Sequence, residues 1–255
     1  GIFEVKNGKA SALDSLQYPN APQSSVEMII RRKDGSIVGC DLRRGLWHLG
    51  STGFVYDSLP VEMGVLNALM EDDEQQLWVG GSLAVACIGP KGTRIFGTED
   101  GLKEVSTNCI VQDANGNVWI GTEGGGATKF SREAFSLYGK GTPFAQRAVF
   151  AISEVAPNHL LVGTEVGLFE LKDGVITEDI TFPLPGVNIL AISKDKYGDP
   201  LVAAQRGTYR LHDGKYTRLE AADVAVRFGA RNFATDEKGN VYGSTSRGIF
   251  TLEGD

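Results

Sequence analysis

Short apolar runs alternate with short polar stretches along the whole chain, and this pattern recurs at a regular interval. Each copy has an apolar run closed by a small residue, a few polar residues, and then a second apolar run that usually begins with glycine, such as Gly45-Leu46-Trp47. The small residues follow one another at intervals of 41, 41, 42, 40 and 40 positions, and they are Gly39, Gly80, Gly121, Gly163, Ala203 and Gly243. Such a constant period is the signature of a repeat architecture.

Each copy contains four strand candidates, here called strands A to D. The third copy shows them most clearly, with strand A at 108–112, strand B at 118–122, strand C at 127–130 and strand D at 134–138. The turn Asp113-Ala114-Asn115-Gly116-Asn117 joins strands A and B, and Asn-Gly between apolar runs is typical of a hairpin. Strand B is apolar at consecutive positions, which indicates burial on both faces. The small residue that closes it is expected to let the adjacent sheet approach closely.

Antiparallel four-stranded units of about 40 residues predict an all-β fold, a β-propeller with six visible repeats of about 40–42 residues. A β-helix would have a shorter period, and helical repeats would show a periodicity that is absent here. We expect a single propeller domain or fragment over 1–255, beginning with an incomplete blade of strands C and D. The expected segments are 1–23 for that partial blade, then 24–60, 61–104, 105–145, 146–185, 186–224 and 225–255.

The two ends of the chain resemble each other. Gly1-Ile2-Phe3 is repeated as Gly248-Ile249-Phe250, and both begin a strand C. One interpretation is a six-bladed propeller in which 10–16 supplies the missing outer strand beside 248–252. The other is six blades of a seven-bladed or larger array, and the redundant first strand favours it.

The composition excludes several classes of protein and partner. Hydrophobic residues make up 42% of the 255 residues and the net charge is −7, so nucleic acid is not an expected partner. No apolar run approaches the ~20 residues that span a bilayer. The basic run Arg31-Arg32-Lys33 and the acidic run Glu71-Asp72-Asp73-Glu74 are interpreted as solvated turn charges.

Candidate catalytic or metal-binding groups are scarce. Cys40, Cys87 and Cys109 lie in strand-like runs without CxxC spacing, which indicates small buried side chains. His48 and His212 are expected on strand C and His159 in an A–B turn, each in a different copy. The Asp-led A–B turns hint at a calcium loop, but the downstream glutamate is missing and hairpin geometry explains them. We therefore expect no catalytic residue, no metal and no cofactor.

A ligand site is expected where strand A begins and where strands B and C are joined, because these segments share one face of a propeller. Alignment on the A–B turn places one position near the start of every strand A in register, and it holds Glu27, Asn67, Asn108, Phe150, Leu190 and Arg231. The B–C loops add Asp41, Arg43, Arg44, Glu123, Glu165, Gln205, Arg206 and Arg247. Mixed polar groups with an aromatic suit a neutral or weakly charged polar ligand, such as a sugar.

The repeat resembles a known family. The residues from Glu99-Asp100-Gly101-Leu102 through Asn115-Gly116-Asn117-Val118-Trp119-Ile120-Gly121 closely resemble the two-component-regulator propeller repeat, and the copies around 67–80 and 236–243 look similar. The resemblance implies a periplasmic or extracellular sensor region of membrane regulators, such as histidine kinases, whose ligands include oligosaccharides. Attached signalling domains and a homodimer are the partners it implies.

Three functions remain open at this point. The first is a ligand-sensing domain of a two-component or related signal-transduction regulator, without enzymatic activity of its own. The second is a protein-interaction scaffold without a small-molecule ligand. The third is a propeller lyase, which the scattered histidines disfavour.

Overall fold

The structure of the protein is a computed structural model that describes residues 2–6, 9–13, 20–22, 25–102, 106–131, 134–139, 141–145, 147–179, 181–219, 230–236, 240–245 and 248–252. The described residues are almost wholly β-structure, with one short 3-10 helix, η1 (Thr98–Asp100). The chain divides into two compact units, Gly1–Ile110 and Val111–Asp255, and the division falls within strand β11.

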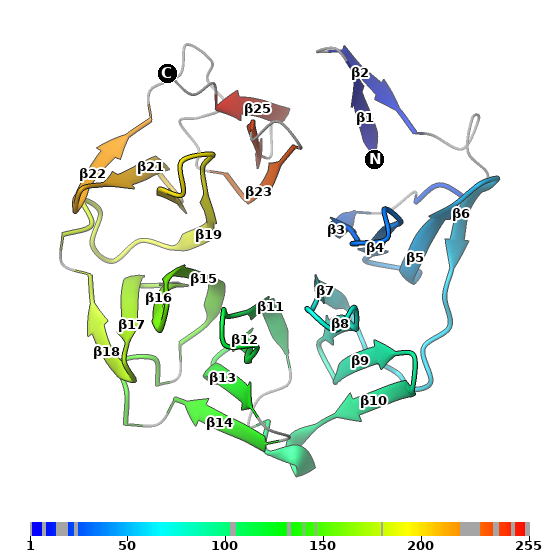
Figure 1. Ribbon diagram of the computed structural model, residues 1–255, viewed down its shortest axis with the longest axis horizontal. Coiled ribbons are helices and arrows are strands. Elements are labelled where there is room, and N and C mark those ends of the chain that lie inside the picture. The colour runs from blue at the N-terminus through cyan, green and yellow to red at the C-terminus, as the bar shows by residue number, and fades with distance from the viewer. Residues whose placement is uncertain are drawn as a thin grey trace. The chain divides into compact units, whose positions relative to one another are not determined.

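The strands form successive antiparallel sheets, each built from consecutive strands (Figure 1). A two-stranded sheet comes first, formed by β1 (Phe3–Lys6) and β2 (Lys9–Ala12). Blade 1 contains β3 (Val26–Arg31), β4 (Ile37–Asp41), β5 (Gly45–Gly50) and β6 (Gly53–Tyr56). Blade 2 contains β7 (Leu66–Glu71), β8 (Leu77–Gly81), β9 (Val85–Gly89) and β10 (Gly92–Phe96).

The remaining four sheets continue the same order. Blade 3 contains β11 (Thr107–Gln112), β12 (Val118–Thr122), β13 (Gly126–Ser131) and β14 (Ala134–Tyr138). Blade 4 contains β15 (Val149–Ala156), β16 (His159–Thr164), β17 (Gly167–Lys172) and β18 (Val175–Glu178). Blade 5 contains β19 (Ile189–Lys194), β20 (Pro200–Ala204), β21 (Gly207–His212) and β22 (Lys215–Arg218). Blade 6 contains β23 (Asn232–Thr235), β24 (Val241–Thr245) and β25 (Gly248–Leu252).

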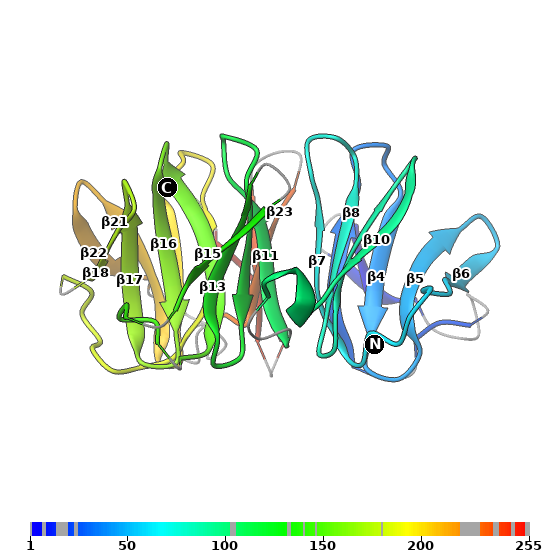
Figure 2. The same ribbon diagram turned by 90° about the horizontal axis from the view of Figure 1, so that it is seen from below.

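These sheets are the blades of a β-propeller, so the fold class expected from the sequence is confirmed. Strands B and D of the third copy match β12 and β14, while β11 begins one residue before the expected strand A. Within the second unit, the first strands β15, β19 and β23 contact one another in turn, and β18 and β22 lie at the outer edges (Figure 1). Figure 2 shows these blades from the side, with their hairpin turns at two opposite ends. In the first unit β2 pairs with β1, and residues 14–16 of the segment expected beside Gly248–Leu252 lie outside the described residues.

The Asp-led A–B turns are organised by their own carboxylates. Asp113 Oδ1 accepts hydrogen bonds from the backbone N–H groups of Asn115 (3.0 Å) and Asn117 (2.9 Å), and its Oδ2 accepts one from Trp119 Nε1 at 2.9 Å. Asp72 accepts the indole N–H of Trp78 in the same way, at 2.8 Å. Because these oxygens are used by the hairpin, turn geometry explains the motif, as the sequence suggested.

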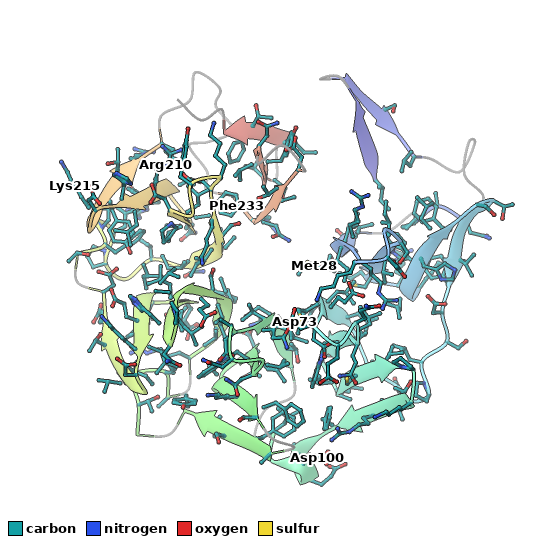
Figure 3. All side chains as sticks on the ribbon, viewed as in Figure 1. Met28, Asp73, Asp100, Arg210, Lys215 and Phe233 are labelled. Atoms are coloured by element: carbon teal, nitrogen blue, oxygen red, sulfur yellow. The ribbon has the colours of Figure 1, made fainter. Side chains whose placement is uncertain are left out.

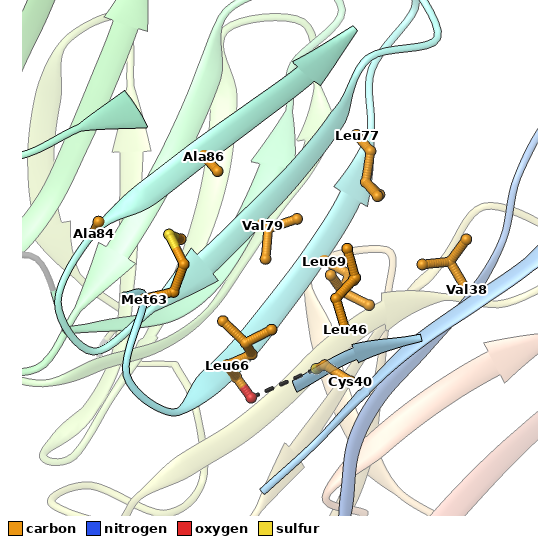
Figure 4. Close-up of a cluster of buried hydrophobic side chains, with 10 residues drawn as sticks. All are labelled: Val38, Cys40, Leu46, Met63, Leu66, Leu69, Leu77, Val79, Ala84 and Ala86. Atoms are coloured by element: carbon orange, nitrogen blue, oxygen red, sulfur yellow. Dashed lines mark hydrogen bonds between the residues drawn. The ribbon is translucent and has the colours of Figure 1, made fainter. Parts of the chain in front are cut away.

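Neighbouring blades pack through apolar side chains. In the first unit, Cys40 and Leu46 of blade 1 belong to one buried cluster with Leu66 and Val79 of blade 2, and the Cys40 thiol donates to the Leu66 carbonyl oxygen at 3.5 Å (Figure 4). In the second unit, Leu161 of blade 4 shares a cluster with residues of blade 5. Strand B is buried at successive positions in both units, because one blade covers each of its faces.

The small residue near the end of strand B has the expected role at two positions. A Cβ atom built on Gly80 would lie 2.5 Å from Thr107 Cγ2, and one on Gly163 would lie 2.6 Å from Ile189 Cγ2, so the next blade does approach closely there. Gly39 and Gly243 are crowded by a different neighbour. At these two glycines the crowding side chain is an aromatic residue of strand C in the same sheet.

The charged runs of blades 1 and 2 match the expectation of solvated turn charges only in part. Arg32 Nε lies 2.9 Å from Glu71 Oε1, and the Glu71 side chain is only 7% exposed. Lys33 Nζ lies 2.9 Å from Asp73 Oδ1, and this second ion pair is exposed at the surface (Figure 3). The two runs lie at neighbouring A–B turns, so the packing of one blade against the next brings opposite charges together.

Candidate functional site

A β-bulge recurs near the start of the first strand in four blades. The pairing register skips one residue between Val149 and Ala151 in blade 4, and the same skip occurs in blades 1, 2 and 5. A bulge leaves one residue out of the ladder and redirects its side chain. The residues left out are Glu27, Asn67, Phe150 and Leu190, four members of the aligned set expected at this position.

The bulge separates these side chains from the core. Leu66 and Ala68 are buried on either side of Asn67, which is half-buried. Val149 and Ala151 flank the half-buried Phe150 in the same manner. The residues before and after the bulge therefore stabilise the blade, and the bulged residue is available to solvent or to a ligand.

The two other members of the set lie in comparable surroundings. The backbone N–H of Arg231 donates to the Ser244 carbonyl oxygen at 2.7 Å, and the next residue, Asn232, pairs with Ser244 as well. Two residues thus face one partner, as in the bulges, and Arg231 is exposed. Asn108 is half-buried and directly follows the fully buried Thr107 in β11.

The B–C turns are joined to the beginning of strand A by a repeated backbone hydrogen bond. The residue after strand B donates its N–H to the carbonyl oxygen of the residue that precedes strand A. The pairs are Leu42 to Ser25 (3.0 Å), Ser82 to Val65 (2.9 Å), Glu165 to Ala148 (3.2 Å) and Gln205 to Asn188 (2.9 Å). Within each of these blades, the B–C turn and the bulge therefore lie at the same end. Four of the B–C residues expected from the sequence, Arg43, Glu123, Glu165 and Arg206, are exposed there, whereas Arg247 lies outside the described residues.

The B–C turn of blade 1 is fixed by a buried carboxylate. Asp41 is 1% exposed, and its Oδ1 accepts the backbone N–H groups of Arg43 (2.9 Å) and Arg44 (2.7 Å). Tyr56 donates its hydroxyl to Asp41 Oδ2 at 2.5 Å, and burial followed by this hydrogen bond raises the pKa of Tyr56. The Arg44 guanidinium stacks 3.8 Å from the centre of the Tyr56 ring. Arg44 is thereby held against the blade, while Arg43 carries no such ring contact among the described residues.

Sequence reasoning missed an apolar component of the same face. Leu42 and Leu83, which follow strand B in blades 1 and 2, are 49% and 54% exposed, and Val65 before β7 is 39% exposed. Their exposure depends on how the turns are folded and therefore carries no signal in the sequence.

The six aligned positions divide between the two units. Glu27, Asn67 and Asn108 belong to the first unit. Phe150, Leu190 and Arg231 belong to the second unit. Phe150 lies on β15, Leu190 lies on β19 and Arg231 directly precedes β23, and β19 contacts both other strands. The second set combines an aromatic, an aliphatic and a cationic side chain, a combination that can contact both the apolar and the polar parts of a small molecule.

The three histidines are each paired with a carboxylate of their own blade. His48 Nδ1 lies 2.9 Å from Asp57 Oδ2, His159 Nε2 lies 3.0 Å from Glu170 Oε2, and His212 Nδ1 lies 2.7 Å from Asp199 Oδ2. His48 and His212 lie on strand C as expected, but His159 begins strand B instead of lying in the turn. Among the residues that the structure describes, no cluster of three or more histidine, cysteine or acidic side chains is arranged to hold a metal ion.

Comparison with known families gives one match. Residues 101–124 match the family described as the two component regulator propeller. The match covers one copy of the repeat, in blade 3. The matched segment includes β11, the Asp113 turn and β12, so the signature lies in the inner hairpin of blade 3.

Solved structures with the same fold include extracellular domains of two component systems. The extracellular domain of BT3049 from B. thetaiotaomicron, described as part of a hybrid two component system, is 18% identical with a TM-score of 0.78, and the match covers 95% of this chain and 35% of that one. The extracellular domain of BT4673 from the same organism is 16% identical with a TM-score of 0.67, covering 92% and 39%. The chain therefore spans between a third and two fifths of the length of these two structures.

An enzyme shares the fold as well. A streptogramin B lyase is 13% identical with a TM-score of 0.79, and the match covers 98% of this chain and 85% of that chain. Identities this low establish the propeller fold alone. No curated protein matches the chain significantly, and no helix among the described residues is long and apolar enough to cross a membrane.

Proposed function

We propose that the chain is the ligand-sensing part of an extracytoplasmic sensor propeller, and that its ligand is a polar small molecule bound in the second unit, where β15, β19 and β23 begin. The observation that carries the proposal is the bulge itself. It recurs at one position in four blades, yet the residue it presents changes from Glu27 to Asn67, Phe150 and Leu190. A purely structural repeat requires the bulge but gives no reason for exposing side chains of such different chemistry.

The extracytoplasmic location and the signalling role are supported by the family repeat and by the extracellular domains that share the fold. In this proposal the ligand is an oligosaccharide or a compound of similar polarity, and binding is passed to signalling domains outside this chain. The chain itself catalyses no reaction. The distribution of the three histidines over three different blades supports this part, because none of them lies beside another.

The test is ligand-induced thermal stabilisation with a panel of neutral and acidic oligosaccharides. A ligand at 100 times its dissociation constant stabilises the folded state by about 2.7 kcal/mol, which is easily measured. Arg231→Ala should abolish the stabilisation, and Phe150→Ala should weaken it. Lys215→Ala is the matched control, because Lys215 is exposed at the C–D turn of blade 5, away from the B–C turns (Figure 3). A shift that survives Arg231→Ala and Phe150→Ala would contradict the proposed site.

A second candidate is a protein-interaction scaffold, which the exposed Leu42, Val65 and Leu83 of the first unit favour. A partner protein would bury these side chains. The two functions differ in one measurement, because Leu42→Ser and Leu83→Ser would reduce binding of a partner protein but leave stabilisation by a small ligand at Arg231 and Phe150 unchanged.

A further inference from the structure

Two joints between blades use a glutamate at the same position of strand A. Glu71 and Glu154 each follow the bulged residue of their strand by four positions. Glu71 Oε2 accepts the backbone N–H of Lys33 in the preceding blade at 2.5 Å, and Glu154 Oε2 accepts the N–H of Ala114 at 2.6 Å. One oxygen of each carboxylate therefore holds the A–B turn of the preceding blade.

The second oxygen distinguishes the two joints. In the joint between blades 1 and 2, Glu71 Oε1 accepts a hydrogen bond from the Arg32 guanidinium at 2.9 Å. The residue that corresponds to Arg32 in blade 3 is Asp113, whose oxygens accept hydrogen bonds from its own turn and from Trp119. Glu154 Oε1 is buried and has no hydrogen-bond partner among the residues that the structure describes. A buried carboxylate oxygen without a donor is costly, so this joint is incomplete by comparison with its homologue.

A hollow of about 110 Å³ lies at this joint, and Glu154 lines it. The walls also include two aromatic side chains, Trp119 and Tyr138, whose ring centres are 5.1 Å apart. The titratable groups around it are three carboxylates, Asp113, Glu154 and Asp173, and one ammonium, Lys129, which lies 5.4 Å from the Trp119 ring centre. A single water molecule needs roughly 10–15 Å³ of cavity volume, so the hollow has room for a group of several non-hydrogen atoms.

We propose that the joint between blades 3 and 4 binds a guanidinium group of a ligand or of a partner protein's arginine. The group would donate to Glu154 Oε1 as Arg32 donates to Glu71 Oε1 in the homologous joint. The excess of carboxylates favours a cation, and the aromatic walls suit a planar, weakly hydrated one. This site lies at the A–B turns, the opposite end of the blade from the B–C turns, and does not depend on the proposed sensing site.

The experiment uses methylguanidinium as the probe, at concentrations far below those that denature proteins. Binding is followed by isothermal titration calorimetry and by the indole N–H signal of Trp119 in a ¹H–¹⁵N spectrum, assigned with Trp119→Phe. Methylguanidinium should shift this signal saturably. Methylurea, which is planar and similar in size but uncharged, should not.

Two variants and one matched control make the test specific. Glu154→Gln keeps an amide oxygen for the Ala114 N–H and removes the charge, so affinity should fall about tenfold or more. Glu71→Gln makes the same change in the joint that Arg32 fills, and affinity should stay within about twofold. Lys129→Met removes the competing cation and should tighten binding, which provides a readout even where Glu154→Gln unfolds.

Three results would overturn the proposal. The first is no saturable shift of the Trp119 signal, which would mean that water alone completes the joint. The second is an equal response to methylurea. The third is an affinity that Glu154→Gln leaves unchanged or that Lys129→Met weakens.

Discussion

Gly163 and Ile189 show how neighbouring blades share a fixed volume. Gly163 Cα faces the fully buried Ile189 of the next blade, whereas the equivalent position of blade 5 holds Ala203. There the facing residue is Ala230, and both alanines are fully buried in one cluster. One joint pairs a glycine with a large side chain, and the other pairs two alanines.

Adding a methyl group to the first joint should therefore destabilise the protein. In Gly163→Ala the new Cβ lies 2.6 Å from Ile189 Cγ2, 2.9 Å from its Cβ and 3.2 Å from its carbonyl oxygen. Overpacking of this kind costs about 1–3 kcal/mol. Ile189→Ala alone should cost about 2–5 kcal/mol, because it leaves a cavity.

Together the two substitutions should cost less than the sum of their separate effects. Ile189→Ala removes the Cγ2 that crowds the new methyl, and the methyl in turn fills part of the cavity. The contact with the carbonyl oxygen remains, so compensation is partial, and we expect a coupling free energy of about 1 kcal/mol. The measurement is urea unfolding of the wild type, both single variants and the double variant, compared where the slope with denaturant is unchanged.

Ile189→Val is the matched control for this cycle. Valine keeps Cβ and Cγ2, so its combination with Gly163→Ala should be additive. Additive costs in the alanine cycle, or an equal coupling in the valine cycle, would refute the idea that Gly163 is required by the side chain of Ile189.

The other predictions concern the turns, the joint between blades 1 and 2, and the thiols. Burial raises the pKa of Asp113, but hydrogen bonds from Trp119, Asn117 and Asn115 outweigh burial, so the pKa is lowered overall. The ionised Asp113 carboxylate therefore stabilises the fold above the ordinary carboxyl pKa, and this stabilisation is lost as the pH falls through the lowered value. Urea midpoints measured between neutral pH and acid should therefore fall less steeply in Asp113→Asn than in the wild type, and parallel curves would contradict the prediction. Arg32→Ala leaves the 7% exposed Glu71 side chain without its guanidinium partner and should lower the free energy of unfolding by about 1–3 kcal/mol. Lys33→Ala removes an exposed ion pair and should change it by less than about 1 kcal/mol. Equal losses in the free energy of unfolding would refute this ranking. Burial raises the pKa of the Cys40 thiol to about 12, so a Cys87→Ala, Cys109→Ala variant should react with a thiol reagent at neutral pH only after unfolding, and rapid labelling of the native protein would be inconsistent with this.

The candidate site was predictable in position but not in geometry. Alignment of the copies placed Glu27, Asn67 and Phe150 at one position, and the structure assigns all three to the same bulge. No residue type at these positions specifies a bulge. A residue of strand A is bulged only when its two neighbours pair with consecutive residues of strand B, and this pairing is set by the folded sheet. The role of Glu154 was hidden for the same reason, since its incomplete hydrogen bonding depends on the turn of another blade.

The sequence by itself determined the repeat, the four strands of each blade and the fold class. These follow from local chemistry: Asn-Gly turns, consecutive apolar positions in strand B, and a small residue at a constant interval all act within one hairpin or one sheet. The tertiary structure decided which charges meet and which volumes are shared. Arg32 finds Glu71, and Gly163 accommodates Ile189, across gaps of 39 and 26 positions in the chain. Such contacts depend on how one blade packs against the next, and a period in the sequence fixes the order of the blades without fixing the atoms that fill the space between them.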